Sequence, residues 1–151
     1  MKHKKGSIVI VAVFVLLTAA LAVIHLTTRE QVPEGSLAVS YNGQIRYIDV
    51  DSLDLIEVSG TVVNGKGEEK EVREQGIAVS DVLRAAGVEP AAISGVTVTA
   101  DDEFSAELSA DEINEDGKAY LTEDEEALTL IVFGDSNSKR RVHNVVKMGV
   151  Y

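Results

Sequence analysis

A short basic cluster near the end of the chain has the residue types best suited to binding chemistry. Lys139-Arg140-Arg141 is followed by His143 and Lys147, and no other basic cluster occurs in the strongly acidic sequence after residue 26. A guanidinium group offers two parallel donors to a carboxylate or phosphate. The cluster therefore predicts a site for an anionic ligand or cofactor at Arg140, Arg141 and His143. The alternative interpretation is a solvated loop and edge strand, balanced by neighbouring carboxylates.

A second pattern is acidic. Residues 112–123 carry acidic or amide side chains at the first, third and fifth positions, Gly117 at the sixth and Glu123 at the twelfth, which is the spacing of a calcium loop. No amphipathic helix flanks the segment, so a hairpin turn at Asp116-Gly117 is the simpler interpretation. The chain has no cysteine, which excludes disulfides, thiolate nucleophiles and thiolate-bound metals.

Charge is divided unevenly along the chain. Three of the 14 Lys and Arg residues lie at positions 2, 4 and 5, and all 25 Asp and Glu residues follow residue 26. The sequence after residue 26 thus has 11 basic and 25 acidic residues, a net charge of −14. A field of this sign repels phosphate backbones and anionic headgroups, so nucleic acid is not an expected partner.

The N-terminal sequence predicts a membrane segment. The apolar run over residues 8–26 would rise about 28 Å as a helix, close to the hydrocarbon thickness of a bilayer. The basic residues before it predict a cytoplasmic tail (1–6), a single-pass signal anchor (7–26), a polar linker (27–36) and an extracytoplasmic domain (37–151). The alternative is a signal peptide cleaved near Ala22, which would release a secreted domain. Either interpretation exports the domain.

The exported part begins with signals for β-structure. Two alternating runs flank Asn42-Gly43, which is a strong hairpin signal. Residues 55–63 are apolar and β-branched and end in a glycine-containing turn. Residues 68–75 alternate in charge with few apolar side chains, and they predict an exposed edge strand.

The second half adds one or two short helices. Residues 80–86 predict a helix with Ser80 as its N-cap and Gly87 as its C-terminal stop, and Ser109 with Glu112 fits a capping box. Further strands are expected over 96–100, 104–108, 128–133 and 142–150. Strict alternation in the last strand would place Arg141, His143, Val145 and Lys147 on one face, opposite Val142, Asn144, Val146 and Met148. Many strands with one or two short helices predict an α+β domain, mostly a mixed β-sheet.

Four segments of this half resemble the sulfite-oxidase-type molybdopterin-binding domain. They are GIAVSDVLRAAG (76–87), VTVTADDEFSAEL (96–108), LTLIVFG (128–134) and RRVHNVVKM (140–148), in the order and spacing of that family. The resemblance covers about residues 56–150. It implies the family's fold, an oxidoreductase activity, and a pocket for molybdopterin whose molybdenum is held by one protein cysteine.

The sequence departs from the family at the residues that carry this chemistry. Val58 stands where the family has its cysteine, in the strand over residues 56–61. The family's arginine, proline, lysine and tryptophan are replaced by Thr129, Phe133, His143 and Asn144. We therefore expect a non-catalytic binding or interaction module, which recognises a small anionic ligand or an envelope protein partner. The alternative is an accessory redox protein that holds a pterin-type cofactor beside a separate electron-transfer partner.

Overall fold

The computed structural model describes Val13, Val15, Thr18, Pro33 and residues 35–124, 127–136 and 138–151. The chain divides into two units, Met1–Gln31 and Val32–Tyr151. The expected tail over 1–6, nearly all of the expected anchor over 7–26 and most of the linker over 27–36 lie outside the described residues. Among the residues that are described, no helix is long and apolar enough to cross a membrane.

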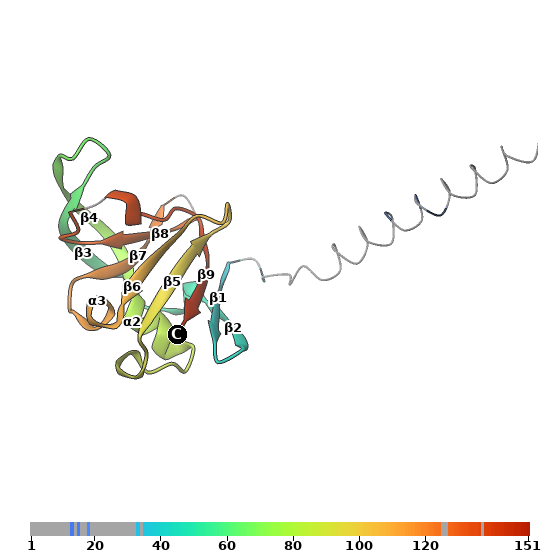
Figure 1. Cartoon of the computed structure of the whole chain (residues 1–151). Helices are drawn as coiled ribbons and strands as arrows, with labels where there is room; N and C mark the ends of the chain where they lie inside the picture. Colours follow the sequence, from blue (N-terminus) through green and yellow to red (C-terminus); the bar gives the residue numbers. More distant parts are fainter. Residues whose placement is uncertain are drawn as a thin grey trace, which may run out of the picture. The chain divides into compact units, whose positions relative to one another are not determined.

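The second unit is mostly β-structure arranged in two sheets (Figure 1). The five-stranded sheet has the order β2-β1-β9-β5-β6, and the four-stranded sheet has the order β3-β4-β7-β8. The strands are β1 (Ser36–Tyr41), β2 (Gln44–Asp49), β3 (Ile56–Val63), β4 (Glu69–Ala78), β5 (Gly95–Ala100), β6 (Ser105–Ser109), β7 (Ala119–Asp124), β8 (Ala127–Val132) and β9 (Val145–Val150).

Two short α-helices and three 3-10 turns complete the unit. They are α2 (Val79–Ala85), α3 (Ala110–Asn114), η1 (Val50–Ser52), η2 (Pro90–Ala92) and η3 (Ser138–Arg140). Most neighbouring strands are antiparallel, but β1 and β9 run parallel, so the five-stranded sheet is mixed. The expected α+β class, mostly β with two short helices, is thus the observed architecture.

Several elements form because of local sequence signals. Asn42 and Gly43 both have positive φ, 50° and 75°, as the tight turn of the β1–β2 hairpin requires. The hydroxyl of Ser109 accepts from the backbone N–H of Glu112, whose carboxylate accepts from Ser109 in return, so the predicted capping box begins α3. At the end of α2, Gly87 has φ +72° and Val88 N–H donates to the Leu83 carbonyl, closing the helix as expected.

The main core lies between the two sheets and α2. Val79, Val82, Leu83 and Ala86 form the buried face of this helix, as the sequence predicts. The remaining fully buried members come from both sheets and include Leu37, Ile77, Val96, Leu108, Leu121, Leu130 and Met148. All of these residues belong to Val32–Tyr151, so we expect this unit to fold without residues 1–31.

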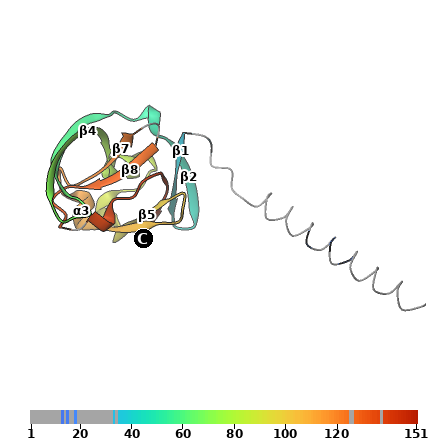
Figure 2. The ribbon, with the colours of Figure 1, turned by 90° about the horizontal axis from the view of Figure 1, so that it is seen from above.

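The four-stranded sheet curls over its own second, smaller core. Seen from above, β4 arches around β7 and β8 (Figure 2). Val58, Val72, Ile131 and Phe133 pack beneath this arch. The backbone N–H of Gly134, just after β8, donates to the Thr61 carbonyl at 2.9 Å, so the loop after β8 reaches the outer edge of β3.

The expected start of the first helix is wrong. Ser80 does not cap α2, because β4 pairs with β7 up to Ala78 and the chain enters the helix directly from the sheet. Ala78 is the N-cap and makes no side-chain hydrogen bond there. β3 pairs with residues 69–76 of β4, and β7 pairs only with residues 76–78, so the segment expected as an exposed edge strand has a strand partner along one side only.

The expected alternation in the last strand is also wrong. β9 begins only at Val145, because Asn144 adopts a left-handed conformation with φ 54° that asparagine tolerates. A register shift against β5 follows at once. Val142 and Val145 are therefore both buried, although they are three residues apart, and Val146 is exposed.

Candidate functional site

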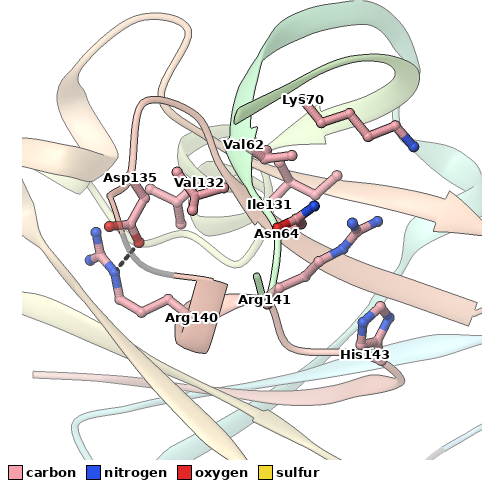
Figure 3. A pocket seen from close by; sticks show the side chains of 11 residues that line it. Val62, Asn64, Lys70, Ile131, Val132, Asp135, Arg140, Arg141 and His143 are labelled. Atoms are coloured by element: carbon pink, nitrogen blue, oxygen red, sulfur yellow. Dashed lines mark hydrogen bonds and ion pairs between the residues drawn. The ribbon is translucent and has the colours of Figure 1, made fainter. Parts of the chain in front are cut away.

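A pocket of about 470 Å³ lies between the β3–β4 hairpin, β8 and the loop that leads into β9 (Figure 3). We call it the basic pocket. It is lined by Val62, Val63, Asn64, Gly65, Lys70, Ile131, Val132, Asp135, Arg140, Arg141 and His143. Its size is in the range of pockets that hold small organic molecules.

The β3–β4 hairpin supplies one wall. Val62 and Lys70 are directly paired across the two strands, so both side chains emerge on the same face of the ribbon. The turn between the strands is ordered by Asn64, whose side-chain oxygen accepts from the backbone N–H of Lys66 at 2.9 Å and of Glu68 at 3.0 Å. The hairpin therefore holds Lys70 over the pocket at a fixed register.

Arg140 stabilises the opposite wall of the pocket, which is formed by the loop after β8. Its Nε donates to Asp135 at 2.6 Å, and its Nη2 donates to Glu112 at 2.7 Å. The three side chains are largely buried, with exposed fractions of 27% for Arg140, 22% for Glu112 and 12% for Asp135. Arg140 thus ties the loop after β8 to the first turn of α3.

These short contacts perturb both charged partners. The hydrogen bond from Arg140, assisted by those from Ser109, lowers the pKa of Glu112 to about 2 in spite of its partial burial. The two carboxylates raise the pKa of the Arg140 guanidinium. Since both shifts favour the ionised forms, Arg140 is held as a permanent cation by protein carboxylates.

Arg141 and His143 make longer contacts with other side chains than Arg140 does. The Nη2 of Arg141 lies 4.0 Å from a carboxylate oxygen of Glu74, and 40% of the Arg141 side chain is exposed. His143 Nδ1 lies 3.3 Å from the hydroxyl of buried Thr129. In the view of Figure 3, Arg141, His143 and Lys70 occupy one side of the pocket, and Arg140 turns away toward Asp135.

The three residues predicted as a site, Arg140, Arg141 and His143, therefore line one pocket. Lys147, from the same basic cluster, lies exposed on β9 and is not among the lining residues. Sequence reasoning missed Lys70, because only the pairing of β3 with β4 and the curl of the sheet bring it within reach. A basic residue in the strand expected over 68–75 was its one local signal.

The residues do not fit the metal-bearing cofactor that the family resemblance implies. Val58, which the resemblance aligns with the family's cysteine, is 4% exposed in the small apolar core beside Ile131 and Phe133, and it does not line the basic pocket. A valine there offers no donor atom to a metal. Within the described part of the chain, no three His, Cys, Asp or Glu side chains are grouped to hold a metal ion.

The acidic segment over residues 112–123 forms no calcium loop either. Glu112 belongs to α3 and is engaged by Arg140, and Glu123 lies on β7. Gly117, with φ +82°, turns the chain between these two elements. This turn at Asp116-Gly117 joins a helix to a strand and is not the hairpin expected.

No family model matches the sequence, and no curated protein matches it. A function is therefore inferred from the pocket, its charges and the N-terminal sequence.

Proposed function

We propose that this protein is a membrane-held, extracytoplasmic binding module that recognises a small anion in the basic pocket. The observation that carries the proposal is the convergence of Lys70 from β4 with Arg141 and His143 from the segment before β9. These residues come from distant parts of the chain. They meet in a domain whose other surfaces are dominated by acidic side chains.

Electrostatics favour the pocket as the place where an anion would bind. With 25 acidic and 11 basic residues after position 26, most of the surface repels anions. Arg141 presents a planar, partly exposed guanidinium, and its nearest carboxylate, on Glu74, is at the 4.0 Å limit of an ion pair. A ligand carboxylate or phosphate could replace that weak contact with two short hydrogen bonds.

The proposed location rests on the N-terminal sequence. Residues 7–26 act as a signal anchor, the basic tail over 1–6 stays in the cytoplasm, and the domain is exported. Protease added to intact spheroplasts should digest the domain and leave the tail protected. Recovery of a mature chain that begins near Ala22 would instead support a secreted protein.

We also infer that the scaffold is a molybdopterin-domain fold that works without its metal chemistry. The four segments that carry the resemblance form α2, β5 with β6, β8, and the stretch from η3 into β9. Val58 supports the second part of the inference, because it places an apolar side chain where the family needs a ligand. An experimental structure superimposed on that family would test the fold assignment.

Anion binding can be tested directly by NMR. Isotope-labelled Val32–Tyr151 would be titrated with sodium acetate at constant ionic strength, against sodium chloride. We expect amide shifts confined to the basic pocket, centred on Asn64, Lys70, Arg141 and His143. Arg141→Ala should abolish them. Arg73→Ala is the matched control, because Arg73 is 70% exposed on β4 and does not line the pocket. Shifts that scatter over the surface, or that survive in Arg141→Ala, would contradict the proposal.

A further inference from the structure

We propose that the ligand of the basic pocket is an organic monocarboxylate, with its carboxylate against Lys70 and Arg141 and an apolar body against Val62. The inference rests on the proposed anion-binding function and adds the chemical class of the ligand. Three features of the pocket carry it: the charge at one end, the charge at the other end, and the apolar floor between them.

The end of the pocket formed by Lys70 and Arg141 would hold the ligand's carboxylate, and we call it the head-binding end. It carries about one positive charge. Lys70 and Arg141 contribute two, and Glu74, 4.0 Å from Arg141, removes one. A carboxylate carries one negative charge, whereas a phosphate monoester carries roughly 1.5 to 2 negative charges at neutral pH. The net charge of this end therefore matches a carboxylate better than a phosphate.

The far end of the pocket carries the carboxylate of Asp135. Asp135 shares the guanidinium of Arg140 with Glu112, so two carboxylates face this one cation. A second anionic group on the ligand would approach Asp135, which lines the pocket. Like charges in a partly buried site repel each other, so a dicarboxylate or polyanion is disfavoured. This arrangement selects ligands with a single charged end.

The floor between the two ends is apolar. Ile131 and Val132 line the pocket but are only 1% and 6% exposed, so the apolar surface open to a ligand comes mainly from the half-buried Val62 of the hairpin. A pocket of about 470 Å³ is far larger than an acetate ion needs. An apolar ligand body would displace water from the half-buried Val62, which strengthens binding.

The test compares ligands that differ in one feature. The full chain in lipid nanodiscs would be assayed by equilibrium dialysis, with empty nanodiscs as the blank, against 3-phenylpropionate, acetate, adipate and phenyl phosphate. We expect 3-phenylpropionate to bind at least about tenfold more tightly than acetate, because of the buried ring. It should also bind more tightly than adipate and phenyl phosphate. Val62→Ser, at the apolar floor, should weaken 3-phenylpropionate more than it weakens acetate.

A charge variant separates this inference from the proposed function. Glu74→Gln raises the charge of the head-binding end from about one to about two, and it leaves the lining residues in place. We expect the preference to move toward phenyl phosphate. If all carboxylates bind alike, sensitive to Arg141→Ala but not to Val62→Ser or Glu74→Gln, anion binding stands and the monocarboxylate inference is overturned. If none of the four ligands binds, both proposals fail.

Discussion

Replacement of Arg140 by methionine should destabilise the folded domain more than any other single loss of charge along the pocket. The methionine keeps much of the aliphatic volume and removes the guanidinium. It breaks the contacts of 2.6 Å to Asp135 and 2.7 Å to Glu112 together. Two carboxylates that are only 12% and 22% exposed are then left without their cation.

The pKa of Glu112 sets the scale of this effect. A fall from 4.5 to about 2 corresponds to roughly 3 kcal/mol of coupling between the carboxylate and its surroundings. Ser109 supplies part of that coupling, and solvent screening at a partly exposed site reduces it further. The loss of the second contact, to Asp135, increases the expected destabilisation. We expect Arg140→Met to lower the free energy of unfolding by about 2–3 kcal/mol, between the values typical of exposed and buried ion pairs.

The assay is urea unfolding of Val32–Tyr151 at pH 7, followed by circular dichroism because the chain has no tryptophan. Arg73→Met is the matched control. Its partner Glu57 lies 3.9 Å away, and the two side chains are about 70% exposed. The control should change the free energy of unfolding by less than about 0.5 kcal/mol. Equal effects of the two substitutions would refute the idea that Arg140 fastens the pocket wall.

Two further predictions concern the carboxylate of Glu112 and the packing of Gly60 against Phe133. Because the folded-state pKa of Glu112 lies below its ordinary value of 4.5, its stabilising contribution is complete above pH 4.5 and is lost as the pH falls through about 2. Urea unfolding between pH 5 and pH 2 should show a flatter stability profile for Glu112→Gln than for the unsubstituted domain, and parallel profiles would contradict this assignment. Gly60→Ala would place a Cβ 2.5 Å from the ring of Phe133, so it should cost about 1–3 kcal/mol by overpacking, measured by urea unfolding. Adding Phe133→Leu should recover part of that loss, and strict additivity of the two changes would count against the contact.

The elements that could be predicted from the sequence are those fixed by interactions within a few residues. Asn42-Gly43 defines a hairpin because both residues accept positive φ. Ser109 and Glu112 are three positions apart and satisfy each other's hydrogen bonds. Neither signal depends on the rest of the fold, so both were recognisable at once.

The misplaced features depend on partners far along the chain. Ser80 has the right chemistry for an N-cap, but pairing of β4 with β7 carries the strand to Ala78 and moves the start of the helix. Asn144 looks like one more residue of a strand, but its left-handed conformation breaks the alternation and brings both Val142 and Val145 into the core. Local patterns cannot report such tertiary constraints.

Of the candidate site, too, only the part that is local in sequence could be predicted. Arg140, Arg141 and His143 are close in sequence, so their grouping was visible, but their division of roles was not. Arg140 ends η3 and Arg141 follows it, and the two side chains take different partners. Arg140 binds Glu112 and Asp135, and Arg141 remains at the pocket. Lys70 is added only through the hairpin.

This division of roles determines how variants of the pocket should be interpreted. The hairpin can carry Lys70 over the pocket only because the loop after β8 closes against β3, where Gly134 donates to Thr61. Arg140 holds the end of that same loop. Its substitution would therefore disturb Arg141 and weaken a bound anion without Arg140 ever touching it. Loss of binding in an Arg140 variant is thus no proof of ligand contact, whereas loss in Arg141→Ala at unchanged stability is.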